Sequence, residues 1–202
     1  MSAAIAAEAP AEPRLERVMR RGPILRPSRG LEGVYGLDLT AGCLIGCPFC
    51  HIRGSRRDPG NGCVRFDPLT AVGLDSALDD LETQVRRVVV SPFSDPLPRE
   101  RAVRTETTRV VDRLLGRGVE VVLMTRGRIP PGLRRRMAEQ ADLCSVAVGL
   151  TTLSKTLMRT LEPGAGTPVG RVRDLKRLIA DGIDVEVRLE PMIAGLTDTR
   201  EN

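Results

Sequence analysis

Three of the five cysteines in this 202-residue chain lie within eight residues, at Cys43, Cys47 and Cys50. Their spacing is C-x3-C-x2-C, and the turn formers Gly46 and Pro48 lie between them. Three thiolates on one tight loop can each bind one iron of a [4Fe–4S] cluster, for which cysteine is the usual ligand. A set of three leaves one iron open, as a catalytic metal site requires and a structural site avoids. The triplet therefore predicts a metal or redox centre.

Two other interpretations of the triplet stay open. A zinc site could use the three cysteines together with His51, the only histidine in the chain. The adjacent Cys50 and His51 would have difficulty reaching one tetrahedral ion together. Three buried, unligated cysteines are the second alternative. A disulfide framework is disfavoured, because the chain has an odd number of cysteines and shows no secretory signal.

The elements around this loop indicate an α/β fold. Apolar, β-branched runs predict strands, here at Val34–Thr40, Arg86–Ser91, Val119–Thr125, Leu143–Leu150 and Ile183–Leu189. Amphipathic stretches predict helices between them, at 68–81 (capped by Asp67), 99–117, 131–140 and 169–180. This alternation predicts a parallel sheet, either open or curved into a partial barrel. The cysteine loop directly follows the first strand, where parallel α/β folds place their chemistry.

Two regions are expected along the chain. Residues 1–30 contain four prolines and read as a poorly ordered N-terminal arm, with a helical turn over Arg14–Arg21. Residues 31–202 are expected to form one core domain, incomplete at its C-terminus. Five strands with their connections fit within this length as a single core.

Composition limits the class of protein. The 41% apolar and 28% charged content is ordinary for a globular domain, and no apolar run approaches the roughly 20 residues that span a bilayer. We therefore expect no membrane partner and a cytoplasmic location. The net charge of +5 allows a nucleic-acid partner, but the 2% aromatic content supplies a poor stacking surface for bases.

The motifs together resemble those of a known superfamily. A strand followed by Cys-x3-Cys-x-aromatic-Cys, with Phe49 as the aromatic residue, is similar to the signature of radical S-adenosylmethionine enzymes. Further segments follow the later strands in order, at Ser91–Pro96, Val148–Leu153, Leu161–Gly164 and Val187–Asp198. As a set, over about Gly33 to Asp198, they resemble the branch related to spore photoproduct lyase.

The resemblance implies a (β/α)6 partial TIM barrel, of which about five βα units are present. It implies a [4Fe–4S] cluster on the three cysteines, whose open iron binds S-adenosylmethionine. Reductive cleavage of that cofactor would give a 5′-deoxyadenosyl radical, which abstracts hydrogen from an unknown substrate. The protein's part is to bind, orient and exclude water. An electron donor of the flavodoxin or ferredoxin type is the implied partner.

The resemblance also implies cofactor contacts, although each residue has a plainer explanation. Ser94 and Asp95 would bind the methionine amino group, or form an ordinary turn. Arg126 would face the methionine carboxylate, or lie solvated in a loop. Thr151 would touch the ribose or carboxylate, or cap a helix. The remaining implied contacts are Phe49, Arg188, which shares a strand face with Glu190, and Met192 near the adenine.

Two departures from the lyase pattern limit the substrate prediction. The lyase has a hydrogen-donating cysteine just before its Ser-Asp pair, but here Pro92-Phe93 occupies that place. Cys63, in a Gly-rich loop, and Cys144, at the start of the fourth strand, are expected to be structural. Repair of DNA photoproducts is therefore not expected. The chain also stops after the fifth strand, so we expect a missing segment or a partner to complete the barrel.

The alternative function is a non-catalytic iron–sulfur or zinc module, possibly associated with nucleic acid.

Overall fold

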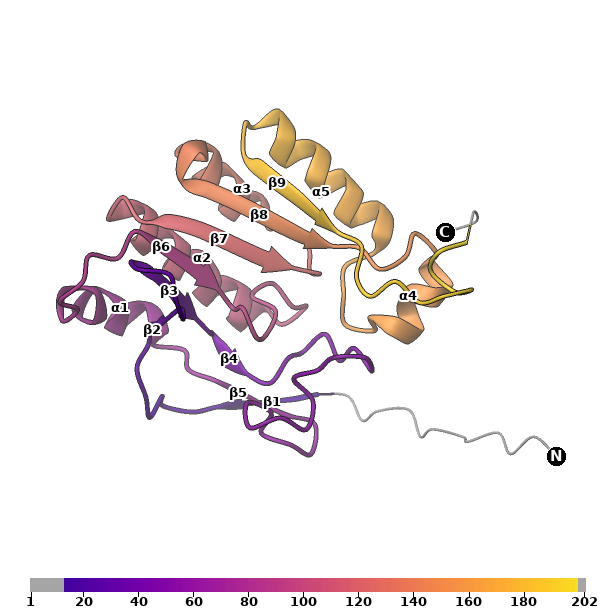
Figure 1. Ribbon diagram of the computed structural model, residues 1–202, viewed down its shortest axis with the longest axis horizontal. Coiled ribbons are helices and arrows are strands. Elements are labelled where there is room, and N and C mark those ends of the chain that lie inside the picture. The colour runs from indigo at the N-terminus through magenta and orange to yellow at the C-terminus, as the bar shows by residue number, and fades with distance from the viewer. Residues whose placement is uncertain (1–12, 200–202) are drawn as a thin grey trace.

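The computed structural model describes residues 13–199 and contains a mainly parallel sheet (Figure 1). Strand order in this sheet is β2-β3-β6-β7-β8-β9, and only β2 runs antiparallel to its neighbour. The strands are β2 (Arg26–Pro27), β3 (Val34–Leu37), β6 (Arg87–Val90), β7 (Glu120–Thr125), β8 (Cys144–Gly149) and β9 (Asp184–Arg188). The predicted α/β class and its five parallel strands are confirmed, with shorter bounds than expected.

Helices cover one face of this sheet (Figure 1). Those packed on it are α1 (Thr70–Asp79), α2 (Arg101–Gly116), α3 (Pro131–Ala138) and α5 (Pro168–Ala180). The short helix α4 (Lys155–Leu161) lies beyond the ends of β8 and β9, and a 3-10 turn spans Ala141–Leu143. Each strand alternates its side chains between the two faces. Leu123 and Val146 are therefore buried in the core under the helices, whereas their neighbours Met124 and Ala147 point to the opposite face and line a cavity. The helix-free face is thus available for a site.

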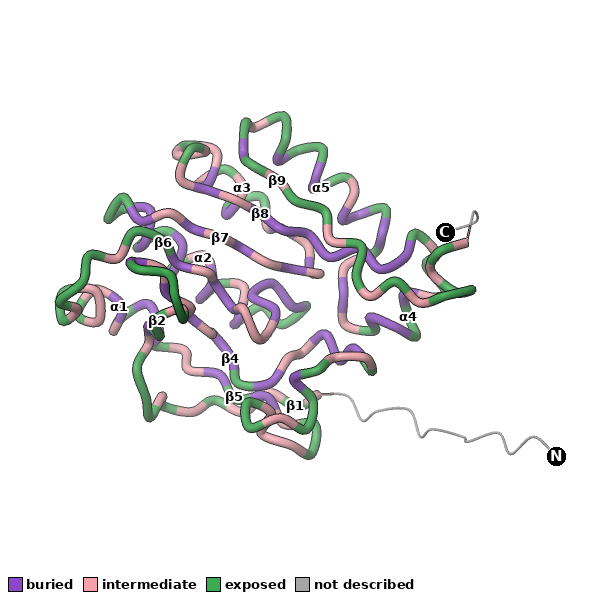
Figure 2. Tube along the Cα trace, viewed as in Figure 1, coloured by how far each residue is buried: buried purple, intermediate pink, exposed green. Residues whose placement is uncertain are grey.

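Burial falls toward one edge of the sheet. The central strands are largely buried, while β9 is mostly exposed along its length (Figure 2). Val187 and Leu189, at the end of β9, are 48% and 61% exposed. An edge strand with exposed apolar residues presents unpaired backbone groups that another strand can cover.

A second, three-stranded sheet corrects the prediction for the N-terminal arm. Strand β1 (Arg14–Arg17) pairs in parallel with β5 (Cys63–Phe66), which pairs antiparallel with β4 (Thr40–Ala41). The helical turn expected over Arg14–Arg21 is therefore wrong, because pairing with a strand distant in sequence overrides the local preference. Residues 1–12 of the expected arm lie outside the described residues, and residues 13–30 include β1 and β2. Cys63 belongs to a strand rather than a loop.

The first helix begins later than expected. Asp67 is not its N-cap, since the helix starts at Thr70 and is preceded by Leu69. The Asp67 carboxylate instead accepts hydrogen bonds from the backbone N–H of Leu69 and of Arg20. Asp67 therefore ties the N-terminal segment to the turn that enters α1.

Helix α4 was not predicted. Its N-cap is Ser154, whose hydroxyl accepts a hydrogen bond from the backbone N–H of Leu157. A serine before a short apolar run is an ordinary start signal, but seven residues show too little periodicity to predict a helix.

Within residues 13–199, no helix combines the length and hydrophobicity needed to cross a membrane.

Candidate metal and cofactor site

A cavity of about 500 Å³ lies at the carboxyl ends of the parallel strands. Its floor is the helix-free face of the sheet, represented by Met124, Ala147 and Gly149. Cys43, Cys47 and Cys50 form one wall, and Arg126 and Arg188 contribute positive charge. Of the predicted site residues, those that line this cavity are Cys43, Cys47, Phe49, Cys50, Ser94, Asp95, Arg126 and Arg188.

The cysteine loop is held by backbone contacts. Gly42 and Gly46 have φ angles of 82° and 74°, a left-handed conformation that side chains disfavour. The Gly164 N–H donates a 2.8 Å hydrogen bond to the Ile45 carbonyl. A Cβ on Gly164 would lie 2.4 Å from the carbonyl oxygen of Leu44, so only glycine permits this approach. The loop's shape therefore depends on a segment more than 110 residues away in sequence.

Burial controls the protonation of the thiols. Removal from water raises the pKa of Cys43 to about 12, and the backbone N–H groups of Ile45 and Asp95 only partly oppose this. Burial likewise raises the pKa of Cys47 to about 12, with Arg126 acting in the opposite direction. Both thiols are therefore protonated near neutral pH in the metal-free protein. Binding of a metal or cluster would release these protons.

We expect Cys43 and Cys47 of the cluster-free protein to resist alkylation. At pH 8, a thiol with a pKa near 12 is ionised in about one molecule in ten thousand, against about one in ten at the ordinary value of 9.0. Iodoacetamide labelling of these residues, followed by peptide mass spectrometry, should be far slower in the folded chain than in urea. It should also increase steeply between pH 8 and pH 10. Equal labelling rates in the folded and unfolded chains would contradict the burial argument.

The donor geometry separates two kinds of metal site. Within the described part of the chain, no three Cys, His, Asp or Glu side chains are close enough to hold one metal ion. His51 lines the cavity with the cysteines, but the four side chains do not form a single-ion site. A cubane cluster makes a different demand, because each thiolate binds its own iron and the ligands lie farther apart.

Ser94 lines the cavity and carries an unsatisfied polar atom. Its Oγ is buried and has no hydrogen-bond partner among residues 13–199. A buried hydroxyl without a partner is costly and calls for a ligand. The preceding Ser91 has a φ of 55°, a strained value for a non-glycine residue, and is 1% exposed. Strain and unsatisfied groups of this kind gather where a fold binds ligands.

The Asp95 carboxylate is hydrogen-bonded to other groups of the protein. Its carboxylate accepts hydrogen bonds from the backbone N–H of Leu97 (2.8 Å) and Arg126 (2.6 Å) and from the hydroxyl of Thr125 (2.8 Å). Burial raises the pKa of Asp95 above its ordinary value, although these three donors oppose the shift. The side chain thus clamps the loop after β6 to the end of β7.

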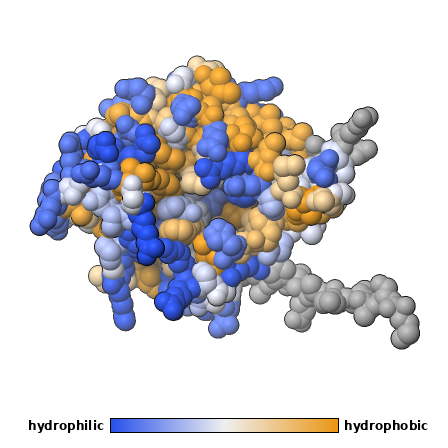
Figure 3. Space-filling model, in the orientation of Figure 1, coloured by the Kyte–Doolittle hydropathy of each residue, from blue (hydrophilic) through white to orange (hydrophobic). Residues whose placement is uncertain are grey.

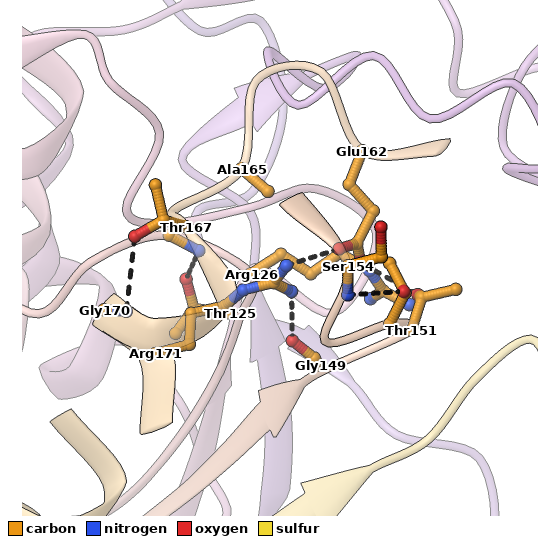
Figure 4. Close-up of polar contacts among 12 residues, drawn as sticks. Thr125, Arg126, Gly149, Thr151, Ser154, Glu162, Ala165, Thr167, Gly170 and Arg171 are labelled. Atoms are coloured by element: carbon orange, nitrogen blue, oxygen red, sulfur yellow. Dashed lines mark hydrogen bonds and ion pairs between the residues drawn. The ribbon is translucent and has the colours of Figure 1, made fainter. Parts of the chain in front are cut away.

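A buried ionic network connects to the cavity lining through Arg126 and Gly149 (Figure 4). Arg171 and Glu162 are both fully buried and form an ion pair at 2.5 Å. Arg171 also donates to the Gly149 carbonyl, at 2.5 Å. Glu162 receives a second guanidinium, since Arg126 Nε lies 2.8 Å from its Oε1. The network joins the ends of β7 and β8 to the segment that supports the cysteine loop.

Arg126 links this network to the cavity. Its Nη2 donates to the Glu190 carbonyl at 2.7 Å, and its guanidinium carbon lies 5.8 Å from the ring centre of Phe49. A cation at this distance over an aromatic face is attracted by the ring. Arg126 is therefore held by partners on three sides, although its side chain stays 21% exposed.

Two predicted residues lie elsewhere. Thr151 is buried, and its hydroxyl lies 2.9 Å from Glu162 Oε1 and 2.8 Å from the Glu190 carbonyl. Met192 is 72% exposed. Neither lines the cavity, so their contact with a cofactor stays a prediction.

Sequence reasoning missed Glu162 and Arg171 as site-supporting residues. The only signal was the Glu-Pro-Gly motif, which does not reveal a buried arginine partner.

Comparisons with known proteins identify the class of fold. No protein-family profile matches the chain. The structure is similar to spore photoproduct lyase with bound dinucleoside spore photoproduct, with a TM-score of 0.64 and 14% identity, covering 89% of this chain and 52% of the lyase. A form of that lyase with bound AdoMet as well matches with a TM-score of 0.64 and 13% identity, covering 88% of this chain and 51% of the lyase. The protein therefore has an α/β fold, with a mainly parallel six-stranded sheet, that is similar to about half of spore photoproduct lyase.

The chain also resembles proteins in sequence, of which two are uncharacterized proteins. An uncharacterized protein of Mycobacterium tuberculosis is 27% identical over 184 residues, covering 83% of this chain and 52% of the relative. An uncharacterized protein of Acidianus two-tailed virus is 23% identical over 197 residues, covering 85% of this chain and 64% of the relative. The chain thus spans about half to two thirds of the length of these relatives.

Proposed function

We propose that this chain is a radical S-adenosylmethionine enzyme of the lyase-like branch. The observation that carries the proposal is the position of Cys43, Cys47 and Cys50 in one wall of the cavity at the carboxyl ends of the parallel strands. The likeness in fold to a lyase whose structure holds AdoMet supports the same reading. The reaction outcome and the substrate stay open.

The residues present fit a [4Fe–4S] cluster. Three thiols line the cavity, which leaves one iron for a cofactor. Cys63 lines a smaller cavity with the same three cysteines, but its thiol donates to Glu16. Ile45 and Cys47 are buried together with Ala165, and Phe49 packs on this group. This apolar shell limits access of water to the cluster. When bound, the cluster and S-adenosylmethionine would supply reductive cleavage of the cofactor and radical chemistry on a substrate.

The polar groups of the cavity fit an amino-acid end of a cofactor. Ser94 Oγ has no partner among the described residues and can bond an amino or carboxylate group. Arg126 and Arg188 can face a carboxylate, and Arg188 is already oriented by its 2.9 Å bond to Glu186. Asp95 acts in this proposal through its backbone N–H beside Cys43 and by positioning Arg126.

The substrate differs from that of the named structural neighbour. Pro92 and Phe93 line the cavity where the lyase pattern has its donor thiol. Cys144 is buried at the opposite end of β8 from the cavity. We therefore infer a reaction that does not return hydrogen from a cysteine at this place. An external electron donor of the flavodoxin or ferredoxin type completes the proposed system.

The exposed edge strand β9 bears on the same proposed function. With Val187 and Leu189 exposed there, one more strand could extend the sheet and close the cavity from that side. We propose that this strand comes from a longer form of the protein or from a partner. Activity tests should therefore use the longest available reading frame as well as this chain.

The direct test is anaerobic reconstitution with iron and sulfide. We expect about four irons per chain and, after reduction, an electron paramagnetic resonance signal that shifts when S-adenosylmethionine is added. Formation of 5′-deoxyadenosine with a strong reductant would complete the assignment. One zinc and no iron would exclude it. Bound iron without any response to the cofactor would favour a non-catalytic iron–sulfur module instead.

Single substitutions of the triplet test the ligands. We expect Cys43→Ala, Cys47→Ala and Cys50→Ala each to abolish stable cluster binding, because two thiolates cannot hold a cubane that needs at least three. Cys63→Ser is the matched control, since Cys63 donates to Glu16 and lies outside the triplet. Iron and sulfide content, measured per folded chain, should fall only in the triplet variants. Full cluster content in any triplet variant would remove that cysteine from the ligand set.

A further inference from the structure

A second and larger cavity lies beside the first. Its volume is about 970 Å³, and its walls come from the N-terminal segment, the end of β3 and the loop that follows the cysteines. Arginines dominate its lining: Arg20, Arg21, Arg26, Arg56, Arg57 and Arg65. Three carboxylates, Glu16, Asp38 and Asp67, also line it. The cavity is thus positively charged, and the function proposed above leaves it unused.

The carboxylates do not neutralise all of these arginines. Arg26 pairs with Asp38 at 3.3 Å, and Arg65 lies 3.9 Å from Glu16. Arg20 donates through Nη2 to the Asp38 carbonyl, but its Nε is buried without a hydrogen-bond partner in the described structure. Of the six lining guanidinium groups, those with no carboxylate partner among residues 13–199 belong to Arg20, Arg21, Arg56 and Arg57.

One arginine is already oriented in this cavity. The guanidinium carbon of Arg57 lies 3.8 Å from the ring centre of Phe93, which is stacking distance. The Phe93 N–H donates at 3.1 Å to Asp38 Oδ1, which fixes the backbone that carries the ring. Stacking restricts the guanidinium without using its donors, so Arg57 stays able to bind an oxyanion.

Phe93 also connects the two cavities. It lines the basic cavity together with Arg57 and lines the cysteine cavity beside Ser94. In the space-filling view, hydrophilic side chains gather over the lower part of the molecule, in the region of β1, β2, β4 and β5 in Figure 1 (Figure 3). A molecule held by the arginines would therefore reach toward the cysteines past this ring.

We propose that the basic cavity binds the phosphate group of a small phosphorylated molecule. Guanidinium groups present a fork of donors that matches phosphate oxygens, and here several groups without a carboxylate partner line one open cavity. Arg20 lines the same cavity, and its buried Nε has no hydrogen-bond partner in the described structure. Three carboxylates in the same lining would repel a continuous polyanion such as single-stranded nucleic acid.

The identity of this molecule as the substrate rests on the proposed function, whereas its binding does not. A phosphate held by Arg56 and Arg57 places the remainder of the molecule next to Phe93 and the cysteine cavity. The phosphate would then be a handle that orients a carbon for the radical chemistry. Binding can be measured without cluster or cofactor, so failure of either idea is seen separately.

The test uses pyrophosphate as a probe for the cluster-free full chain. We expect saturable binding by calorimetry and by a shift of the phosphorus resonance, at constant ionic strength set with sodium chloride. The double variant Arg56→Gln/Arg57→Gln should bind at least about tenfold more weakly, since each lost charged hydrogen bond weakens the complex. Arg135→Gln, an exposed arginine of α3, is the control for the change in charge and should bind like the parent chain.

Three outcomes would overturn the proposal. They are absence of saturable binding, unchanged binding by the double variant, and equal weakening by Arg135→Gln, which would show a general charge effect. Tighter binding of a single-stranded oligonucleotide than of pyrophosphate, lost in the double variant, would instead assign the cavity to nucleic acid. Far-ultraviolet circular dichroism should show that the double variant remains folded, because both side chains are exposed.

Discussion

Replacing Glu162 with glutamine is expected to lower the free energy of unfolding by about 3 kcal/mol or more, because it leaves the buried charge of Arg171 without its partner. Both side chains are 0% exposed, and their ion pair is 2.5 Å long. Glutamine keeps the shape of the side chain but removes the charge that offsets the desolvation of Arg171. Urea unfolding, followed by circular dichroism, measures the change.

A matched substitution isolates the effect of burial. Glu139 pairs with Arg136 at 3.4 Å, and its side chain is 59% exposed. Exposed pairs contribute at most about 1 kcal/mol, so Glu139→Gln should change stability little. The double variant Glu162→Gln/Arg171→Met should recover part of the loss, because it removes the unpaired buried cation. Equal effects of Glu162→Gln and Glu139→Gln would show that the network does not stabilise the fold.

Replacing Gly164 with alanine is expected to weaken cluster binding by about 10–100-fold, the usual effect of disturbing the groups that position metal ligands. The added Cβ would lie 2.4 Å from the Leu44 carbonyl oxygen and 2.8 Å from Ile45 Cα. Both are backbone atoms, so the cysteine loop itself must move. Iron content after reconstitution at limiting iron, compared with the parent chain, measures the effect.

The control for this prediction is a glycine whose replacement should not disturb the cysteine loop. Gly132 lies in α3, and a Cβ added there meets nothing within 4 Å. Gly132→Ala should leave iron content unchanged and raise stability by up to about 1 kcal/mol, because alanine favours the helix. Normal iron content in Gly164→Ala would mean that the loop tolerates displacement, or that the cysteines do not hold a cluster. The triplet variants distinguish these two cases.

Several features of the fold were accessible from sequence because they depend on local patterns. The β-branched runs predict β6, β7 and β8, although in β6 and β7 the buried residues on the helix-covered face alternate with more exposed ones. The helix over Pro168–Ala180 was predictable from its periodicity, although it begins one residue earlier than expected. Errors arose where partners are distant in sequence. Strand β1 exists only through pairing with β5, some 50 residues away.

The chemistry open to Cys43, Cys47 and Cys50 follows from the sequence alone, because three thiols within eight residues restrict it whatever the fold. What the tertiary structure decided is where that loop faces and what holds it. Gly164 against Ile45, the Arg171–Glu162 pair and the unpartnered hydroxyl of Ser94 come from segments up to 120 residues apart. Contacts of this kind arise only when the sheet places its strand ends side by side, so no local pattern can predict them.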